Sequence, residues 1–433
     1  MALSGKIDAL LRGTYRDTET GAPVAVATRS LAIERSLAGM EADLVCGLGF
    51  GRRVAVVSDR TTHAVLGERV ERAIAGSHQV DSVVLEVGVH PDDAAVARVR
   101  SATAGADALI AVGSGTINDI GKHASAQDGK PYAVFATAPS MNGFVSINAA
   151  ITVHGHKLSL PAQAPMGAFF DLSILGAAPP RLLRAGLGDS LCRTTAQADW
   201  LMAHLLFDTP YRELPFDLLA DDEAPLFAGA AELMRGDAEV VERLVNTLLL
   251  AGFGTAIVGN SQPASQGEHL VSHFIDMFAD PDRPLVFHGE QVGVTTLSVA
   301  RLQERMLEEP PRFRADAGTE EDFAGRYGDE LGRSCWAAYR EKRIDAAKAE
   351  AVNALVAERW DAIRERVGAI LLPARHLEAV LRAAGADLTP EAIHLSRGFY
   401  ERALIRAREI RDRYTCLDLA ADAGWLASLV PSL

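Results

Sequence analysis

The stretch ALIAVGSGTINDIGKHAS, residues 108–125, decides the fold class of this chain. Its first part, 108–113, is a run of small and branched apolar residues that predicts a buried strand, and helical spacing begins near Ile117. Between them lies GSGT at 113–116, where glycine lets backbone N–H groups approach an anion closely. The positive end of the helix dipole that follows attracts phosphate. The stretch therefore predicts a strand, a turn and a helix that can hold a pyrophosphate.

The turn departs from the G-x-G-x-x-G dinucleotide fingerprint, because Asn118 stands where the third glycine belongs and the turn follows the third predicted strand. From the glycines alone, a phosphate-binding turn and an ordinary tight turn remain equally open. Asp59 is open in the same way, since it ends a predicted strand. A carboxylate there either accepts hydrogen bonds from an adenosine ribose or caps the next helix.

Three more apolar runs alternate with helical patterns: VAVVSD at 54–59, SVVLEV at 82–87 and YAVFAT at 132–137. Such alternation predicts an α/β fold with a parallel, Rossmann-like sheet. Strands that are apolar on both faces indicate burial on both sides. Parallel sheets bind ligands at the carboxyl ends of their strands, so this region is expected to bind a nucleotide.

The pattern changes after Pro179–Pro180, where proline ends the preceding element. Long segments such as 237–258 and 346–367 carry apolar residues three and four apart, which predicts helices. We therefore expect a nicotinamide-nucleotide-binding α/β domain over 1–178 and an all-α metal- and substrate-binding domain over 179–433.

Composition narrows the class of protein. A chain of 433 residues with 48% hydrophobic and 23% charged residues predicts two or three ordinary globular domains. The net charge of −14 disfavours nucleic acid and anionic membranes as partners. Its four cysteines lie far apart and form no C-x-x-C pair, so neither a disulfide framework nor a thiolate zinc site is expected: Cys46, Cys192, Cys335 and Cys416.

Three segments bear on location and local structure. The N-terminal sequence meets charge early and lacks the pattern of a secretory signal, which favours the cytoplasm. The most apolar run, Leu248 to Val258, is about half of the ~20 residues that a membrane span needs, so we expect a buried helix there. The stretch 308–314, rich in Pro, Glu and Arg, predicts a loop.

Two histidines four residues apart, His269 and His273 in GEHLVSHFIDM, fall on one face of a predicted helix, within roughly 5–6 Å of each other. His288 has Gly289 beside its ring, and Asp189 in AGLGDSLCR supplies a candidate carboxylate. Two imidazoles and a carboxylate hold a divalent ion and leave positions open for substrate. Each residue also has a structural alternative, a helix cap for the aspartate and a hydrogen-bonded core position for a histidine.

Other polar residues are weaker candidates. His154 and His156 flank a glycine in VHGHKLSLP, which is more typical of a turn, so we leave them out of the predicted metal site. Lys157 and Arg193 are candidate anion contacts, although such side chains usually lie solvated on the surface.

Six motifs in order carry a family resemblance: GSGTINDIGKHAS, TAPSMNGFVS, AGLGDSLCRTTAQADW, PASQGEHLVSH, HGEQVG and IRDRYTCLDLAADAGWL. The whole chain resembles the sn-glycerol-1-phosphate dehydrogenases of bacterial type. Their superfamily also holds iron-containing alcohol dehydrogenases, glycerol dehydrogenase and dehydroquinate synthase. The resemblance implies a homodimer with metal and substrate in a cleft between its two domains.

The resemblance also implies NAD or NADP as cofactor and one divalent metal ion. Zinc, nickel, iron and manganese all accept two imidazoles and a carboxylate, so the ion stays open. Carried over by position, the metal ligands are Asp189, His269 and His288. The implied cofactor-binding residues are Asp59, Gly113, Ser114, Gly115, Thr116, Asp119, Thr137 and Ser140. Arg60 beside Asp59 leaves both NAD and NADP open.

Two segments depart from the family pattern, at three positions. Asn142 stands where the family usually has Asp, and an amide cannot accept a proton or supply negative charge. Gln262 replaces the arginine of S-R-P-A-S-G, and Gln266 its glycine. Gln262 in place of arginine removes a bidentate phosphate clamp, and Gln266 in place of glycine adds bulk. The substrate is thus either glycerol 1-phosphate with its ketone, dihydroxyacetone phosphate, or a related small polyol.

The favoured hypothesis is reversible, metal-assisted reduction of a ketone to a secondary alcohol by NADH or NADPH. His273 is the candidate proton relay, with Asn142 and Lys157 as further catalytic candidates. Two alternatives stay open. One is a cyclase or lyase of dehydroquinate-synthase type that uses NAD transiently, and the other is a nucleotide-binding homologue that has lost catalysis.

Overall fold

The computed structural model describes residues 4–433, which divide into two compact units. Each unit is assembled from several stretches of the chain. Within the described residues, unit 1 comprises 4–153, Leu158–Ser190 and Glu213–Ser261, and unit 2 comprises His154–Lys157, Leu191–Arg212 and Gln262–Leu433.

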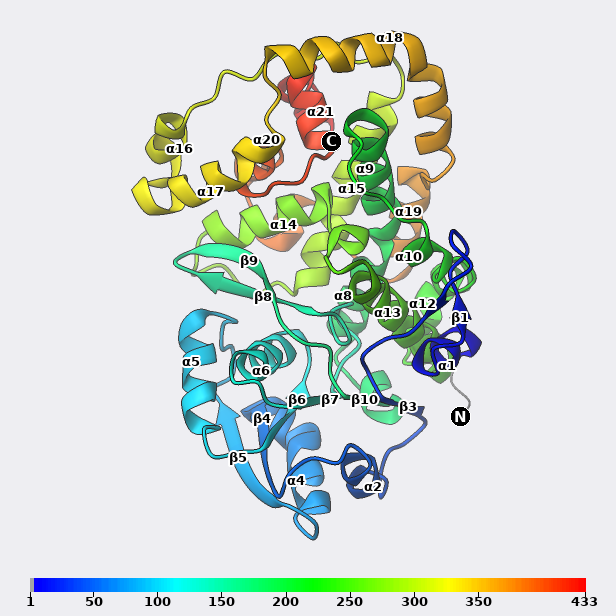
Figure 1. The fold of residues 1–433 in the computed structure, drawn as a ribbon, viewed down its shortest axis with the longest axis vertical. Helices are drawn as coiled ribbons and strands as arrows, with labels where there is room; N and C mark the ends of the chain where they lie inside the picture. The colour runs from blue at the N-terminus through cyan, green and yellow to red at the C-terminus, as the bar shows by residue number, and fades with distance from the viewer. Residues whose placement is uncertain (1–3) are drawn as a thin grey trace. The chain divides into compact units, whose positions relative to one another are not determined.

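A parallel six-stranded sheet forms the centre of unit 1 (Figure 1). Its strands, in order across the sheet, are β3 (Ser30–Glu34), β10 (Gly167–Asp171), β7 (Tyr132–Ala136), β6 (Ala108–Gly113), β4 (Arg53–Asp59) and β5 (Gln79–Leu85). The predicted α/β class and all four predicted strands are confirmed. Sequence patterns did not indicate β3 and β10, which have five residues each and stand apart from the alternating region.

Helices and two small strand pairs complete unit 1. The helices are α1 (Gly5–Leu11), α2 (Glu41–Cys46), α3 (Arg60–Thr62), the π-helix η1 (His63–Gly67), α4 (Glu68–Ile74), α5 (Asp93–Ala102), α6 (Gly115–Gln127), α7 (Leu172–Gly176), α8 (Pro180–Leu191), α10 (Leu214–Asp217), α11 (Glu223–Ala228), α12 (Ala230–Leu233) and α13 (Ala238–Val258). The pairs are β1 (Tyr15–Arg16) with β2 (Pro23–Val24), and β8 (Asn148–Val153) with β9 (His156–Pro161). The last residue of α8 and the first two of β9 belong to unit 2.

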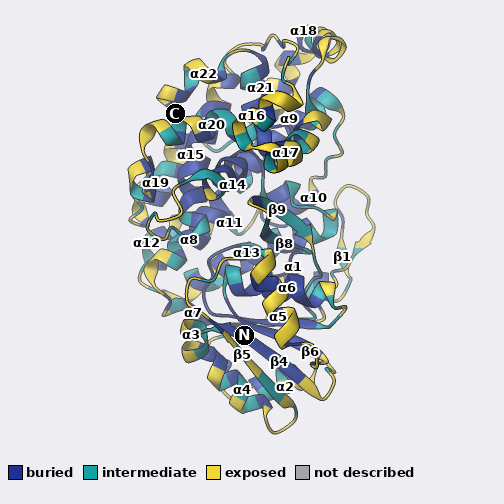
Figure 2. Ribbon diagram, turned by 90° about the vertical axis from the view of Figure 1, so that its left-hand side faces the viewer, coloured by how far each residue is buried: buried dark blue, intermediate teal, exposed yellow. Residues whose placement is uncertain are grey.

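The strands read as continuous apolar runs because helices cover both faces of the sheet. Every residue of β6, β7 and β10 is buried, whereas in the edge strand β5 only Leu85 is buried. Figure 2 shows the burial of the residues along the chain. In Figure 1, α5 and α6 lie on one side of the sheet and α2 and α4 on the other. Buried runs of this kind are typical of parallel sheets covered on both faces.

The chain reverses its direction of travel across the sheet between β4 and β6. From β4 it passes to the edge strand β5, and from β6 it passes the opposite way to β7. The loops after β4 and β6 therefore diverge and leave a crevice at their carboxyl ends. Val57 pairs with Ala111 in the register, so Asp59 lies level with Gly113 at this point.

The apolar segment before Val258 is α13, a helix of 21 residues. It is long and apolar enough to cross a membrane by length and composition, and 61% of its most apolar window is buried inside the protein. Asp237 caps its N-terminus and Gly259, with φ of 85°, ends it in the left-handed conformation. The predicted buried helix is confirmed.

Unit 2 is helical, as predicted for the second half of the chain. Its elements are α9 (Arg193–Phe207), η2 (Gln262–Ala264), α14 (Gly267–Phe278), α15 (His288–Met306), α16 (Glu320–Tyr327), α17 (Asp329–Lys342), α18 (Ala346–Gly368), α19 (Ala374–Ala383), η3 (Pro390–Ile393), α20 (Arg397–Arg406), η4 (Ala407–Ile410), α21 (Cys416–Asp422), α22 (Leu426–Leu429) and η5 (Val430–Ser432). The predicted loop at 308–314 lies between α15 and α16. One apolar core joins α9, α14, α15 and α18 to the C-terminal helices.

Candidate functional site

The predicted phosphate turn closes β6 and opens α6. The helix begins at Gly115, two residues before the expected start. Ser114 takes the N-cap position, yet its hydroxyl caps no backbone N–H of the helix. That hydroxyl instead donates to the carbonyl of Ala138 at 3.3 Å and contacts the hydroxyl of Ser140. The structure thus brings Ser114 and Ser140 together and keeps the side-chain cap off the positive end of α6.

The two glycines of the turn serve different purposes. A Cβ atom on Gly113 would lie 2.6 Å from Cβ of Ile117, so this glycine is needed for strand and helix to pack closely. A Cβ atom on Gly115 would lie 3.4 Å from Cγ of Met141, an ordinary contact. Gly115 is therefore not required by packing, and the absence of a side chain there lets a ligand approach the backbone closely.

Asp59 forms the helix cap that sequence reasoning left open. Its Oδ1 accepts the backbone N–H of Thr62 at 2.8 Å, and the hydroxyl of Thr62 accepts the N–H of Asp59 at 3.0 Å. Its Oδ2 has no hydrogen-bond partner within residues 4–433. Capping uses one oxygen only, so the ribose role stays a prediction.

The remaining predicted cofactor residues lie around the same crevice. Thr137, just after β7, is buried and donates its backbone N–H to the carbonyl of Gly113 at 3.1 Å. Thr116, in the first turn of α6, is half-buried. The carboxylate of Asp119 accepts the backbone N–H of Ala150 at 3.2 Å, which ties α6 to β8. Asp119 therefore has a structural contact that its sequence position did not suggest.

Sequence reasoning missed Lys122, which lies within the quoted motif and is fully buried. Its ammonium donates to the hydroxyl of Ser146 and the carbonyl of Asn148, both at 3.0 Å, and to the carbonyl of Gly143. Burial lowers the pKa of Lys122 to about 8. The sequence offered one indication of its role, because a lysine on the buried face of a predicted helix needs polar partners. It holds the loop that carries Asn142.

Asn142 and Asp189 contact each other within unit 1. The backbone N–H of Asn142 donates to Oδ2 of Asp189 at 2.7 Å. Asp189 is buried near the C-terminal end of α8. Its carboxylate is therefore oriented by main chain, a contact that does not depend on whether residue 142 is Asn or Asp.

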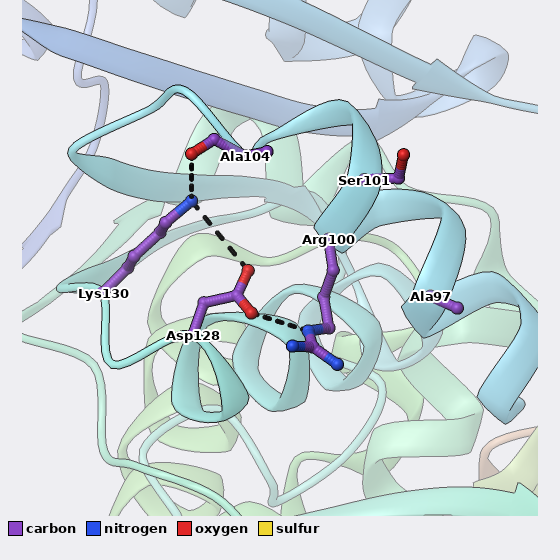
Figure 3. A pocket seen from close by; sticks show the side chains of 6 residues that line it. All are labelled: Ala97, Arg100, Ser101, Ala104, Asp128 and Lys130. Atoms are coloured by element: carbon purple, nitrogen blue, oxygen red, sulfur yellow. Dashed lines mark hydrogen bonds and ion pairs between the residues drawn. The ribbon is translucent and has the colours of Figure 1, made fainter.

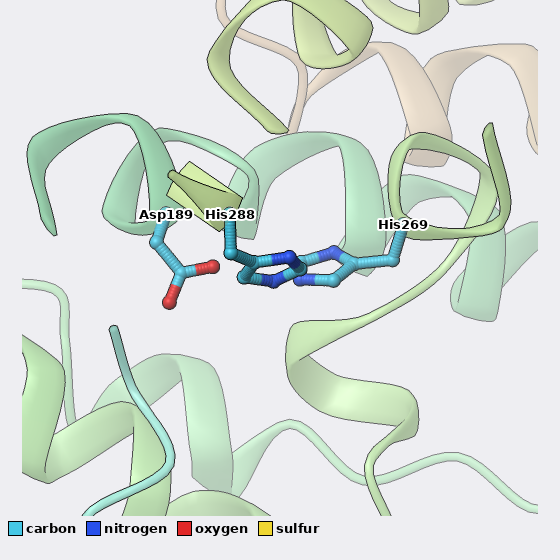
Figure 4. A group of neighbouring side chains, drawn as sticks. All are labelled: Asp189, His269 and His288. Carbon is cyan, nitrogen blue, oxygen red and sulfur yellow. The ribbon is translucent and has the colours of Figure 1, made fainter. Parts of the chain in front are cut away.

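Three histidine rings lie together within unit 2. The ring centroids of His269 and His288 are 5.2 Å apart, and each lies 6.0 Å from the centroid of His273. His269 and His273 share one face of α14, as their spacing predicted, and His288 is the first residue of α15. Figure 4 draws His269 and His288 with Asp189 as side chains that each offer one ligand atom.

Glu268 supports this cluster and was not singled out from the sequence. Its Oε1 lies 3.0 Å from Nδ1 of His269, and its Oε2 accepts the hydroxyl of Thr195 at 3.1 Å. A carboxylate on Nδ1 fixes the imidazole tautomer that offers Nε2 to a metal. Cys192, Glu268 and His269 form a second group whose ligand atoms all lie within 4.8 Å of one another.

A second buried carboxylate, Asp199, lies close enough to Glu268 for their charges to interact. It accepts the backbone N–H groups of Cys416 at 3.0 Å and Gly267 at 3.1 Å. Burial, together with the negative charge of Glu268, raises the pKa of Asp199 to about 7. These bonds fix the N-terminal turn of α14, where His269 begins the histidine cluster.

The other candidate residues of unit 2 occupy distinct places. Lys157 lies in β9, with its ammonium 3.9 Å from Oδ2 of Asp276. The guanidinium of Arg193 donates to Oε1 of Gln197 at 2.7 Å, which is a local helix contact. Burial lowers the pKa of His273 well below its ordinary value, and the neighbouring charge of Arg411 lowers it further.

The predicted turn contains His154, whereas His156 is the first residue of β9. His154, with φ of 49°, lies exposed in the turn between β8 and β9. His156 is buried, and its two ring nitrogens lie 2.8 Å from the hydroxyl of Ser334 and 3.2 Å from the carbonyl of Ile410. Burial lowers its pKa to about 4, and Arg411 adds to this. Both ring nitrogens are thus already engaged.

A surface pocket of about 520 Å³ lies elsewhere in unit 1, where α5 and α6 end (Figure 3). Its charged groups pair with one another: Arg100 lies 2.6 Å and Lys130 3.9 Å from the carboxylate of Asp128. Lys130 also donates to the carbonyl of Ala104 at 3.2 Å. Because α5 and α6 lead into β6 and β7, the pocket lies at the amino edge of the sheet, away from the phosphate turn. It has no connection with the predicted chemistry.

Comparison with known proteins identifies the family. Residues 32–179 match the model of the family described as iron-containing alcohol dehydrogenase. The glycerol-1-phosphate dehydrogenase (NAD(P)+) of Thermococcus kodakarensis is 31% identical over 274 residues, 63% of this chain and 77% of that protein. The enzyme of the same name from Geobacillus stearothermophilus is 30% identical over 403 residues, 89% of this chain and 92% of that protein.

This chain belongs to the glycerol-1-phosphate dehydrogenase family. The resemblance drawn from the six motifs is therefore confirmed. Solved structures show the same fold as this family member. A probable glycerol dehydrogenase from Sinorhizobium meliloti has a TM-score of 0.61 at 17% identity, covering 93% of this chain and 98% of that chain.

A sulfoacetaldehyde reductase from Bifidobacterium kashiwanohense, solved in complex with NAD+, has a TM-score of 0.60 at 15% identity and covers 94% of this chain and 97% of that chain. In this glycerol-1-phosphate dehydrogenase family member, the two departures lie in different units. Asn142 belongs to the loop held by Lys122. The carbonyl of Gln262, in η2, accepts from Nε2 of Gln266 at 3.1 Å.

Proposed function

We propose that this chain interconverts dihydroxyacetone phosphate and sn-glycerol 1-phosphate with NADH or NADPH, using one divalent metal ion held by Asp189, His269 and His288. The family is one of metal-containing, NAD(P)-linked alcohol dehydrogenases, so the reaction type follows from membership. The observation that supports the proposal best is the closeness of His269 and His288, whose ring centroids are 5.2 Å apart. The carboxylate of Glu268 also contacts Nδ1 of His269.

The residues present fit a divalent ion. Two imidazoles and one carboxylate form a donor set suited to a catalytic ion. Asp189 is favoured as the third donor because it lies near the end of α8 and precedes Cys192 by only three residues. The thiol of Cys192 lies within 4.8 Å of the ligand atoms of Glu268 and His269.

The crevice of unit 1 fits a dinucleotide. Bare backbone at Gly115, an N-terminus of α6 without a side-chain cap and Asp59 level with the turn all lie at the switch point of the sheet. Gly113, Ser114, Thr116, Asp119, Thr137 and Ser140 remain the other predicted cofactor contacts.

When bound, the ion would polarise the ketone oxygen and the nicotinamide would supply hydride. The protein's own groups position these partners. Glu268 keeps Nδ1 of His269 engaged, so that Nε2 would be the ring nitrogen available to an ion. Asn142 orients the carboxylate of Asp189 through its backbone N–H. Its amide side chain cannot take up the proton, so we assign proton transfer to His273, with Lys157 beside it.

We also infer a cytoplasmic homodimer that binds neither nucleic acid nor membrane. The net charge of −14 and the burial of α13 support this inference. Assigning nucleotide binding to 1–178 and metal binding to 179–433 is likewise our prediction. Sedimentation of the purified protein tests the dimer, and a monomer would contradict it.

A panel of phosphorylated and unphosphorylated ketones, assayed for NADH and NADPH oxidation after metal reconstitution, tests the function. We expect the highest kcat/KM with dihydroxyacetone phosphate and net accumulation of oxidised cofactor. Turnover without that accumulation would indicate the cyclase or lyase alternative. Metal near one ion per chain without oxidation of either cofactor would indicate a homologue that has lost catalysis.

A further inference from the structure

The guanidinium of Arg411 contacts the main chain of Lys157 inside unit 2. Nη2 of Arg411 donates to the carbonyl oxygen of Lys157 at 2.5 Å. Lys157 comes from β9, and Arg411 follows η4, the short helix that packs on α14. Two segments 254 residues apart thus meet here, and the positive charges of both residues act on His273.

Within residues 4–433, the two cations have few anionic partners, although the charge of Asp412 acts favourably on Arg411. The Lys157 ammonium makes no hydrogen bond within residues 4–433, and its ion pair with Asp276 is long, at 3.9 Å. Asp276 also accepts from Gln291 at 3.0 Å and lies 3.7 Å from Arg283, so its charge is shared. Arg411 donates one hydrogen bond to a neutral carbonyl and makes no ion pair in the described chain.

Burial makes this arrangement unfavourable unless an anion completes it. The side chain of Lys157 is only 14% exposed. Burial lowers the pKa of Arg411 to about 10, and the positive charge of Arg413 acts in the same direction. Buried cations with unfilled donors carry a large desolvation penalty, which a bound anion relieves.

The cation pair lies beside the histidine cluster. Both Lys157 and Arg411 act electrostatically on His273, whose Nδ1 is buried without a hydrogen-bond partner in the described chain. The ring centroid of His273 is 6.0 Å from those of His269 and His288. An anion bound by the two cations would therefore lie near His273, whose ring neighbours the rings of the proposed metal ligands His269 and His288.

We propose that Arg411 and Lys157, bordered by His273, form the subsite that binds the phosphate group of the substrate. This inference rests on the proposed function and specifies it. A guanidinium offers a planar fork of donors to phosphate oxygens, and an ammonium adds a compact charge. The pair supplies, from β9 and the segment after η4, the cationic contact that Gln262 lacks.

The test uses Arg411→Gln and Lys157→Gln in the metal-reconstituted enzyme. Its measure is kcat/KM for dihydroxyacetone phosphate divided by kcat/KM for dihydroxyacetone. Losing one charge-assisted hydrogen bond should lower this ratio by about 10- to 100-fold in each variant. Arg364→Gln, which removes the same charge from a half-exposed position on α18, should leave the ratio unchanged.

Binding of inorganic phosphate, measured by calorimetry, provides a readout independent of turnover. The wild type and Arg364→Gln should bind it, and both site variants should bind it more weakly. Equal ratios and equal phosphate binding in all four proteins would overturn the subsite. If Arg411→Gln does not fold, Lys157→Gln decides, because its side chain makes no hydrogen bond in the described chain.

The two proposals fail in different ways. Wild-type enzyme that oxidises NADH or NADPH with neither ketone would contradict the proposed function, while its phosphate binding still tests the cation pair. Wild-type enzyme that reduces dihydroxyacetone phosphate, with variants that lose activity on both ketones equally, would contradict the subsite alone.

Discussion

The phosphate turn of unit 1 and the histidine cluster of unit 2 are built in opposite ways. The turn consists mostly of main chain: a strand end, a helix start and two glycines within three residues. The histidine cluster consists of side chains from α14 and α15, held by a buried carboxylate network. Main-chain sites should respond to added bulk, whereas side-chain sites should respond to lost charge and lost donors.

The largest effect is expected at the histidine cluster. His269→Ala removes a proposed metal ligand and should lower kcat by roughly 1,000-fold, since a bound ion contributes several kcal/mol to the transition state. The turn lies in unit 1, so cofactor affinity, measured by fluorescence titration with NADH and NADPH, should stay the same. Unchanged turnover, or loss of the fold, would contradict this assignment.

A smaller effect is expected at the supporting carboxylate. Glu268→Gln keeps the size of the side chain but removes the charge on Nδ1 of His269. Such a change should weaken metal binding by about 10- to 100-fold, measured by competition with a chelator. Glu358→Gln, at an exposed position of α18, is the matched control, and equal affinities in the two variants would refute the role of Glu268.

The two glycines of the turn should separate packing from ligand approach. Gly113→Ala places Cβ 2.6 Å from Ile117 and should lower the free energy of unfolding by about 1–3 kcal/mol. Gly115→Ala fits without a clash. It should preserve stability but weaken cofactor binding by about tenfold. Urea unfolding measures the stability of both variants, and titration with NADH measures their cofactor affinity. A stable Gly113→Ala variant together with a destabilised Gly115→Ala variant would contradict this division of roles.

The smallest effect concerns His156, whose folded-state pKa of about 4 lies below its ordinary 6.5. Between these values the unfolded chain binds a proton that the folded chain does not, so stability falls as pH drops from 7 toward 4. In His156→Gln, the loss of stability between pH 7 and pH 5 should shrink by about 1–2 kcal/mol. An unchanged difference, from urea unfolding at both pH values, would show that this histidine is not responsible.

The same contrast explains what the sequence could predict. The strands at 54–59 and 108–113 could be predicted from the sequence because burial on both faces requires a run of apolar residues. The shared helix face of His269 and His273 could be predicted because a spacing of four residues is about one helical turn. Lys122, Glu268 and Arg411 were not selected, since lysine, glutamate and arginine usually lie on the surface. Their significance comes from burial and from partners distant in sequence, which spacing does not encode.

The discontinuous make-up of unit 2 has a consequence for synthesis on the ribosome. Its core includes Leu201 and Leu206 of α9 as well as Leu417 and Leu419 of α21 near the end of the chain. At about 5–20 residues per second, α9 emerges roughly 10 to 45 s before the last helices that cover it. During that interval its apolar face is open to molecular chaperones and to aggregation. Stop codons or slow codons late in the message should therefore reduce the yield of soluble protein even where they spare every residue of the sheet.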